Sequence, residues 1–373
     1  MSEFSAADYG HMAHALRLAR KGLYTTTPNP RVGCVIVKDG AIVGTGWHER
    51  AGEAHAEIHA LREAGDAARG ATVYVTLEPC SHHGKTPPCA DALVRAGVAR
   101  VVAAMQDPNP SVAGEGLARL AAAGVQVESG LLEAAARELN PGFIKRMLLG
   151  HPYVRLKTAA SLDGKTALAN GASQWITGAA ARADAQRLRA RACAILTGSG
   201  TVLADDPRLD VRDFDIGRQP LRVVADTRLR TPPQARLLAG GKALIVCAEP
   251  EPKKMAALEA AGAKILCLPG SDGRVDLAAL LAHLARQGVN ELHVEAGARL
   301  AGALLAAGLV DEWVHYAAPL VLGEPGRGLF AGLDLTTLEQ ARAFRVADER
   351  RVGRDWRFTL RPDTSAGPAT MPS

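Results

Sequence analysis

The sequence places a histidine, a glutamate and two cysteines where they could bind a metal ion and move a proton. His55 and Glu57 open a predicted helix. Cys80 follows a predicted strand, and Cys89 opens the next predicted helix. One imidazole and two thiolates supply three zinc ligands and leave the fourth tetrahedral position for water. Glu57 could reach that water without binding the metal, accept its proton and deliver it to a leaving amine.

Taken alone, each of these residues has an ordinary structural explanation. A histidine near a helix start is usually a cap or a surface residue, and two cysteines eight residues apart are usually unpaired thiols. The six cysteines of the chain show no disulfide-framework spacing, so a reduced protein is expected, in which a close cysteine pair favours a metal site. Together, and in this order, the residues match the His-x-Glu and Pro-Cys pattern of zinc deaminases.

The elements that must position these residues alternate along the N-terminal part of the chain. Asp39-Gly40 between two β-rich runs predicts a hairpin. The predicted helices cover 8–23, 54–64, 89–97, 115–123 and a last segment ending near 149, and the predicted strands cover 33–37, 41–47, 71–77, 100–105 and 125–128. Alternating strands and helices predict a layered α/β domain, which we assign to residues 1–149.

The pattern restarts after residue 150 and predicts a second α/β domain over 150–362. Its predicted strands are 153–159, 221–225, 243–247, 264–268, 291–294 and 313–318, with helices at 179–192, 252–262 and 276–286. This half lacks a strand–GxGxxG–helix unit, so a Rossmann domain is unsupported. Residues 363–373 are small and polar, and we expect them to be disordered.

Composition excludes several classes of protein. With 47% hydrophobic and 22% charged residues, the chain of 373 residues can fill two cores, which excludes disorder for most of it. The net charge of +5 suits an anionic small molecule as well as nucleic acid, but only 4% aromatic residues argue against a single-strand binder. No apolar stretch is long enough for a membrane span, and we expect a cytoplasmic protein.

The second half carries groups that could bind phosphate. Gly198-Ser199-Gly200-Thr201 offers backbone N–H groups and hydroxyls, and Glu295-Ala296-Gly297-Ala298 lets the backbone approach a ligand closely. Plain turn chemistry explains each of these stretches about as well. Eight arginines add planar phosphate-binding groups, although some must belong to solvated helix faces: Arg182, Arg187, Arg189, Arg191, Arg208, Arg212, Arg218 and Arg222.

Long stretches of both halves resemble the bifunctional deaminase–reductase family of riboflavin biosynthesis. TTPNPRVGCVIV, GTGWHERAGEAHAEIHAL and TLEPCSHHGKTPPC resemble its deaminase half, and TGSGTVLADDPRLDVR and VEAGARLAGALL its reductase half. The resemblance spans nearly the whole chain. It implies an N-terminal cytidine-deaminase-like α/β/α sandwich and a C-terminal dihydrofolate-reductase-like α/β domain.

The resemblance also implies roles for individual residues. In the deaminase half, one zinc ion would be held by His55, Cys80 and Cys89, with Glu57 as the proton shuttle. Substrate contacts would come from Asn29, His48, Lys85, Asp107 and Asn109, and His82 and His83 stay outside the coordination sphere. In the reductase half, NADPH contacts would come from Ala159, Trp175, Thr201, Asp205, Thr227 and a loop formed by Gly297, Ala298, Arg299, Leu300, Ala301, Gly302 and Ala303. Substrate contacts there would come from Lys157, Ser173, Arg189, Leu209, Arg212 and Glu295.

The implied substrate is a diaminopyrimidinone carrying a phosphoribosylamino group, deaminated by zinc-activated water and then reduced by NADPH. The expected partners are therefore this phosphorylated pyrimidine and a second copy of the chain in a homo-oligomer, without nucleic acid or membrane. Three other interpretations stay open. The first is a nucleic-acid or nucleoside deaminase with an accessory domain, the second is a binding module that kept the fold and lost turnover, and the third is an enzyme in which only one half is active.

Overall fold

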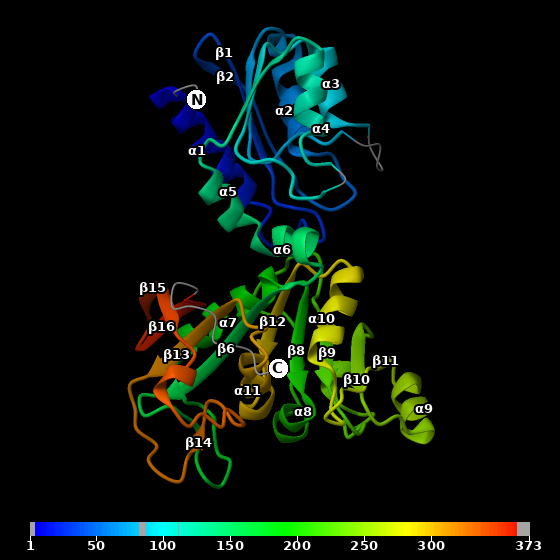
Figure 1. The fold of residues 1–373 in the computed structure, drawn as a ribbon, viewed down its shortest axis with the longest axis vertical. Helices are drawn as coiled ribbons and strands as arrows, with labels where there is room; N and C mark the ends of the chain where they lie inside the picture. The colour runs from blue at the N-terminus through cyan, green and yellow to red at the C-terminus, as the bar shows by residue number, and fades with distance from the viewer. Residues whose placement is uncertain (1–3, 82–86, 111, 364–373) are drawn as a thin grey trace. The chain divides into compact units, whose positions relative to one another are not determined.

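The computed structural model describes residues 4–81, 87–110 and 112–363. Lys85, which is predicted to contact the substrate, lies outside these residues. So do His82 and His83, which are predicted not to bind the metal. The chain divides into two compact units between His151 and Pro152 (Figure 1). Both units are α/β, as predicted. In the described part of the chain, no helix combines the length and the apolar character that a membrane crossing requires.

The first unit is built on a five-stranded sheet with the order β2-β1-β3-β4-β5. β1 pairs antiparallel with β2 and β3, whereas β3, β4 and β5 run parallel. The strands are β1 (Gly33–Lys38), β2 (Ala41–Trp47), β3 (Thr72–Val75), β4 (Arg100–Ala103) and β5 (Gln126–Ser129). The helices are α1 (Ala6–Arg20), α2 (Ala56–Ala64), α3 (Cys89–Ala96), α4 (Glu115–Ala122), α5 (Glu133–Leu139) and α6 (Pro141–Leu149), with a 3-10 turn η1 (Gly65–Ala68).

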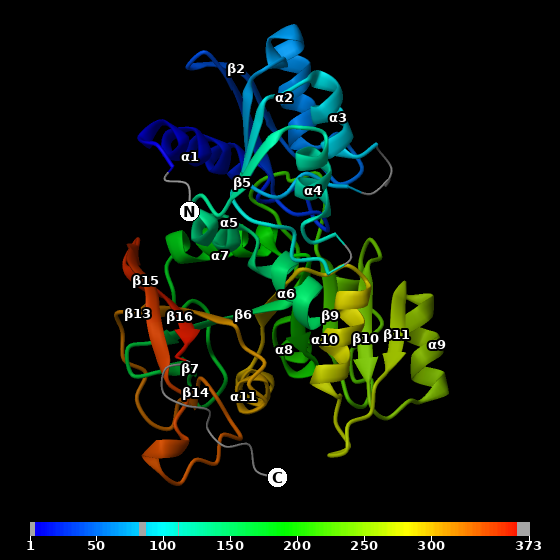
Figure 2. The same ribbon diagram turned by 45° about the horizontal axis from the view of Figure 1, so that its top comes forward.

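Helices cover both faces of this sheet. One core joins α2, α3 and α4 to side chains such as Ile36 and Val73, and a second core joins α1 and α5 to Val35 and Tyr74 (Figures 1 and 2). Burial on both faces explains why β1 is a continuous apolar run instead of an alternating one. The unit is therefore the three-layer α/β/α sandwich that the sequence predicts.

A close approach of β2 to α2 fixes where the metal-binding histidine lies. A Cβ atom at Gly46 would stand 2.1 Å from the carbonyl oxygen of Ala56, so only glycine permits this contact. Ala56 follows His55, the N-cap residue of α2. The glycine thus lets the first turn of α2 pack directly against the sheet.

The second unit contains a nine-stranded sheet with the order β11-β10-β9-β8-β12-β6-β13-β16-β15. The first seven strands of this order run parallel, and β16 and β15 add an antiparallel edge. The strands are β6 (Tyr153–Ser161), β8 (Ala194–Gly198), β9 (Leu221–Ala225), β10 (Ala243–Cys247), β11 (Ala263–Cys267), β12 (Glu291–Glu295), β13 (Glu312–Ala318), β15 (Phe344–Val352) and β16 (Asp355–Pro362). β7 (Lys165–Ala167) and β14 (Arg327–Gly328) form a separate antiparallel pair.

The helices of this unit pack on both faces of the large sheet. They are α7 (Ala179–Arg191), α8 (Ser199–Asp205), α9 (Pro252–Ala260), α10 (Leu277–Arg286) and α11 (Ala298–Ala306), with 3-10 turns η2 (Arg236–Leu238) and η3 (Leu338–Gln340). The largest core packs α10 and α11 against β6, β8 and β12. Smaller clusters join α9 to β9 and β10 and α7 to β13.

Three sequence-based expectations differ from the structure. The single helix expected to end near 149 is two helices, because Pro141 begins α6 directly after α5 ends. The loop expected over 297–303 is wrong: only Gly297 precedes the helix, and α11 starts at Ala298. The hairpin of β15 and β16 was not predicted: β15 carries a charged, largely exposed run, and the alternation of Trp356, Phe358 and Leu360 with polar residues in β16 was overlooked.

Candidate metal centre and cofactor-binding edge

The structure brings His55, Cys80 and Cys89 together. The Nδ1 atom of His55 lies 3.5 Å from Sγ of Cys80 and 3.3 Å from Sγ of Cys89. All three ligand atoms lie within 4.8 Å of one another. Zn–S bonds of about 2.3 Å and Zn–N bonds of about 2.0 Å imply a sulfur–nitrogen separation of about 3.6 Å in a tetrahedral site. The residues therefore fit one zinc ion with a fourth position left over.

The two cysteines are electrostatically unequal before any metal binds. Hydrogen bonds from the Cys89 thiol and backbone N–H, together with His55, hold the pKa of Cys80 well below its ordinary value. The hydrogen bond to Cys80 and burial raise the pKa of the Cys89 thiol. One thiolate is thus favoured at neutral pH without the metal, and a cation would favour the second.

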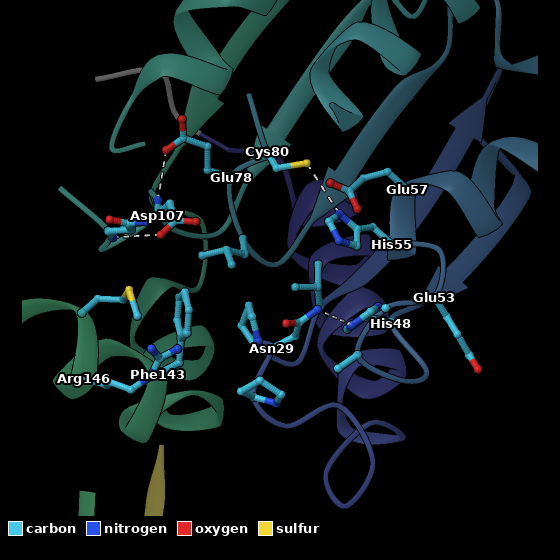
Figure 3. A pocket seen from close by; sticks show the side chains of 18 residues that line it. Asn29, His48, Glu53, His55, Glu57, Glu78, Cys80, Asp107, Phe143 and Arg146 are labelled. Atoms are coloured by element: carbon cyan, nitrogen blue, oxygen red, sulfur yellow. Dashed lines mark hydrogen bonds between the residues drawn. The ribbon is translucent and has the colours of Figure 1, made fainter. Parts of the chain in front are cut away.

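Glu57 lies in the first turn of α2, beside the three ligands, and is only 3% exposed. Burial, reinforced by the Cys80 sulfur, raises the pKa of Glu57 to about 7. A carboxyl group with such a pKa can both accept and release a proton near neutral pH. Figure 3 shows its carboxyl group beside His55 at the wall of a cavity of about 570 Å³.

Asn29 and His48 form a second polar group in this cavity. Nδ1 of His48 contacts the carbonyl oxygen of Ala54 at 3.1 Å, and its Nε2 contacts Nδ2 of Asn29 at 3.0 Å. The carbonyl oxygen can only accept, so Nδ1 carries the proton and Nε2 accepts from the Asn29 amide. Burial lowers the pKa of His48, which favours this neutral form. The carbonyl oxygen of Asn29 is left facing the cavity (Figure 3).

Glu78 is a site residue that sequence reasoning missed. It is 3% exposed, and its carboxylate accepts four backbone N–H groups. Oε2 accepts from Asp107 and Gly114 at 3.0 Å each, and Oε1 accepts from Gly116 at 2.8 Å and Leu117 at 3.3 Å. Glu78 thereby joins the loop before Cys80 to the loop after β4 and to the start of α4. The feature of the sequence that could have identified Glu78 is its position two residues before the predicted metal ligand Cys80.

Asp107 and Asn109 line the same cavity as the metal ligands. The Asp107 carboxylate accepts the backbone N–H of Asn109 at 2.8 Å, so it shapes its own loop. Both residues follow β4, at the carboxyl-terminal edge of the parallel strands, where ligands favour open α/β sheets. Of the predicted deaminase residues that the structure describes, all but Cys89 line this cavity, and Cys89 lies directly behind it, 3.3 Å from His55.

In the second unit, Arg189 of α7 and Glu295 at the end of β12 form a two-pronged ion pair. Nε and Nη2 of Arg189 donate to the two carboxylate oxygens at 2.6 and 2.8 Å. His293, fully buried, contacts Oε1 of Glu295 at 3.1 Å. Although burial opposes it, the Arg189 charge and these bonds hold the pKa of Glu295 well below its ordinary value.

Lys157 lies beside this pair, because it is the register partner of Glu295 on the neighbouring strand β6. Its ammonium group also stands 5.8 Å from the ring centroid of Tyr316. Burial, together with the Arg189 charge, lowers the pKa of Lys157, while Glu295 acts in the opposite direction. A lysine with a lowered pKa is a group that can transfer a proton.

Several predicted cofactor residues gather at the carboxyl-terminal ends of β8 and β12. Thr201 lies in α8, directly after β8, and a Cβ atom at Gly297 would stand 3.8 Å from its hydroxyl oxygen. A Cβ atom at Gly198 would contact Leu300 of α11. Thr227 follows β9, the next strand of the sheet. Ala298, Arg299, Ala301, Gly302 and Ala303 lie in α11.

The other predicted residues of this unit lie on separate segments, of which the one after α8 reaches the ion pair: Nη1 of Arg189 donates to the backbone carbonyl oxygen of Asp210 at 3.1 Å. Ala159 lies on β6, Ser173 and the 65%-exposed Trp175 precede α7, and Asp205 ends α8. Leu209 is buried after α8, and Arg212 pairs with Asp210 at 3.1 Å.

Three arginines considered for phosphate binding have structural partners instead. Arg191 pairs with the buried Glu291 at 2.7 Å. Arg218 donates to backbone carbonyls at the end of α7, and Arg222 donates to three carbonyls around η2. These contacts join loops to the sheet, so the positions do not point to a ligand.

Comparisons with known proteins agree with this geometry. The model of the RibD C-terminal domain matches residues 152–356, and that of the cytidine and deoxycytidylate deaminase zinc-binding region matches residues 6–105. The riboflavin biosynthesis protein RibD of Escherichia coli (strain K12) is 52% identical over 361 residues, covering 93% of this chain and 97% of that protein.

Two solved structures are similar over 96% of this chain and 99% of their own. That of Acinetobacter baumannii RibD, form 1, is 46% identical with a TM-score of 0.90. That of a diaminohydroxyphosphoribosylaminopyrimidine deaminase/5-amino-6-(5-phosphoribosylamino)uracil reductase from Thermotoga maritima is 32% identical with a TM-score of 0.85.

Proposed function

The chain belongs to the RibD family of riboflavin-biosynthesis proteins, and on this premise we propose the reaction that each unit carries out. It is a bifunctional enzyme, a deaminase and a reductase, and the two folds expected from the sequence are confirmed. The first unit would deaminate 2,5-diamino-6-(5-phosphoribosylamino)pyrimidin-4(3H)-one. The second would reduce the ribose side chain of the product with NADPH, giving the ribitylamino-uracil phosphate.

The deaminase proposal rests on the cluster of three metal ligands, two of which line one cavity together with Glu57. Zinc bound by these ligands would lower the pKa of a coordinated water to about 7. Glu57 would accept the proton of the attacking water and deliver it to the departing ammonia. The Asn29 carbonyl oxygen would accept an N–H of the pyrimidine, and His48 would hold the Asn29 amide in that orientation.

Replacing Glu57 by glutamine tests the deaminase proposal. Glu57→Gln keeps the size of the side chain and removes its proton transfer, so ammonia release should fall by at least about 100-fold. Zinc content and NADPH oxidation by the second unit serve as controls that the chain is folded. Parent protein that releases ammonia no faster than the variant would show that the first unit is not this deaminase.

The reductase proposal rests on the ion pair of Arg189 with Glu295 at the end of β12, and on Lys157, the register partner of Glu295 in the middle of β6. NADPH would supply the hydride when bound near α8 and the start of α11. Reduction of the ribosylamino group also consumes one proton, which Lys157 could donate to the sugar oxygen released as the ring opens. Glu295 would hold the charge of Lys157 and bind sugar hydroxyls.

A comparison of two arginines on α7 tests this assignment. Arg189→Ala removes the partner of Glu295, and NADPH oxidation should fall at least about 100-fold while ammonia release is kept. Arg187→Ala is the matched control, because Arg187 is 68% exposed on the same helix and its nearest ion pair is 3.8 Å long. Equal rates of NADPH oxidation in the two variants would contradict the assignment of Arg189 to the reductase site.

A further inference from the structure

The deaminase cavity is larger than the group on which the chemistry occurs. Its volume of about 570 Å³ lies in the middle of the range that holds whole small-molecule ligands. A pyrimidine ring placed against His55, Cys80 and Glu57 would fill only part of it. The remaining space extends toward α6, where Phe143, Arg146 and Met147 line the wall.

The charges around this cavity are unevenly distributed. Three acidic side chains, those of Glu57, Glu78 and Asp107, line it, whereas the exposed Glu53 at its rim points its carboxylate away from the cavity (Figure 3). Among the described lining residues, Arg146 is the one lysine or arginine. His48 adds no charge, because burial lowers its pKa and its Nε2 accepts a hydrogen bond from Asn29. A dianionic group in the described part of the cavity therefore has one permanent cation to bind.

Arg146 stands apart from the metal ligands. Figure 3 shows Arg146 and Phe143 of α6 on the other side of the cavity from His55, Cys80 and Glu57. A ligand that reacts at the metal ligands and reaches α6 must be longer than a nucleobase and carry its charge at the far end. Guanidinium groups bind phosphate oxygens through two parallel N–H groups, which also fixes orientation.

We propose that Arg146 binds the phosphate of the deaminase substrate and makes this unit selective for the phosphorylated pyrimidine over the same compound without phosphate. The inference rests on the proposed function of the first unit and assigns the anchoring of its substrate to a residue of α6. Phe143 packs beside the phosphoribosyl group, and the carboxylates of Asp107 and Glu57 repel a phosphate placed elsewhere in the cavity. Only one orientation then brings the amine to Glu57.

The test compares two substrates and two neighbouring cations. Ammonia release is measured with the phosphorylated pyrimidine and with the same compound after phosphatase treatment. In Arg146→Met, kcat/KM for the phosphorylated substrate should fall by about 10- to 100-fold, the effect of losing a charged hydrogen-bonding pair. For the dephosphorylated compound, kcat/KM of Arg146→Met should differ from that of the parent by less than threefold. Arg146→Lys should recover part of the loss, because lysine keeps the charge without the fork.

Lys145→Met is the matched control, since Lys145 lies on the same helix and outside the cavity lining. It should leave the ratio of the two kcat/KM values as in the parent. Inorganic phosphate should inhibit the parent competitively and Arg146→Met at least tenfold more weakly. NADPH oxidation by the second unit reports in every variant that the chain is folded.

The outcomes separate this inference from the proposed function. If the parent releases ammonia from neither compound, the proposed function itself fails. If the parent is active but Arg146→Met loses the same factor with both compounds, Arg146 has a structural role and the inference is wrong. The inference is also wrong if Arg146→Met keeps the full preference of the parent for the phosphorylated compound.

Discussion

Gly116 offers a sharp test of how packing positions the metal ligands. A Cβ atom at Gly116 would stand 1.9 Å from the carbonyl oxygen of Pro79, the residue before Cys80. Real Cβ contacts do not fall below 3.0 Å, so Gly116→Ala requires the helix and the loop to separate by at least 1.1 Å (3.0 minus 1.9). The Glu78 carboxylate would then lose its 2.8 Å bond to the Gly116 N–H.

The cost of this separation can be approximated from its parts. Overpacking of this kind costs about 1–3 kcal/mol, and each lost hydrogen bond to a charged group about 1.5–3 kcal/mol. Gly116→Ala should therefore lower the free energy of unfolding of the first unit by about 2.5–6 kcal/mol, out of about 5–15 kcal/mol for a typical domain. A shift of Cys80 by 1.1 Å would also exceed the tolerance of about 0.2 Å for metal–ligand distances.

Zinc content at a buffered zinc concentration, ammonia release and NADPH oxidation measure these effects in one preparation. We expect loss of zinc and of ammonia release with NADPH oxidation kept. Gly10→Ala is the matched control: Gly10 is an exposed position of α1 with no atom within 4 Å of a Cβ, so alanine should stabilise by about 0.5–1 kcal/mol. Gly116→Ala with parent-like zinc content and ammonia release would refute the reasoning.

Three further predictions concern charge and metal. Hydrogen bonds from Arg100, Tyr74 and Ser5 hold the pKa of Asp8 well below its ordinary value, although burial acts in the opposite direction. The Asp8 carboxylate therefore stabilises the first unit above about pH 4, and this stabilisation is lost as the pH falls below that value. Asp8→Asn should lower the free energy of unfolding by about 2–4 kcal/mol at pH 7. It should also weaken the fall of the free energy of unfolding with decreasing pH, measured by urea unfolding at several pH values; an unchanged pH dependence would contradict this. His293→Phe removes a hydrogen-bond donor to Glu295, so the pKa of Glu295 should rise. The acid limb of the pH–rate profile of NADPH oxidation should then move to higher pH. A pH–rate profile that does not move would show that His293 does not act on Glu295. Dialysis against a chelator should abolish ammonia release, reversibly on adding zinc, while NADPH oxidation with the deaminated compound supplied as substrate stays; loss of both activities under these conditions would contradict the separation of the sites.

Local patterns predicted most elements of this fold. The strands 221–225 and 243–247 match β9 and β10 residue for residue, because each is a short apolar run bounded by polar residues. The hairpin turn at Asp39-Gly40 appears where predicted, with positive φ values of 50° and 79°. The prediction failed at α11, where Gly297 and the residues after it were expected to form a loop. Alanine and leucine favour a helix, and the apolar side of this helix packs against the sheet.

The chemistry of the metal site was readable from the sequence because zinc demands particular residue types. His55, Glu57 and the two cysteines are distinctive by identity and by order, whatever surrounds them. The resemblance to a known family extended this prediction to four further residues that line the cavity, Asn29, His48, Asp107 and Asn109. The four N–H groups accepted by Glu78 lie 29 to 39 residues away, and no local signal announces such a bond.

The sequence by itself determined two α/β halves and the residue types of a zinc-dependent reaction. Only the tertiary structure decided which charges meet a ligand. It turned Arg191, Arg218 and Arg222 toward protein partners and joined Arg189 to Glu295 across 106 residues. It also brought Arg146 into the deaminase cavity. The physical reason is that an arginine looks the same in sequence whether it binds a carbonyl, a carboxylate or a phosphate, and packing alone selects its partner.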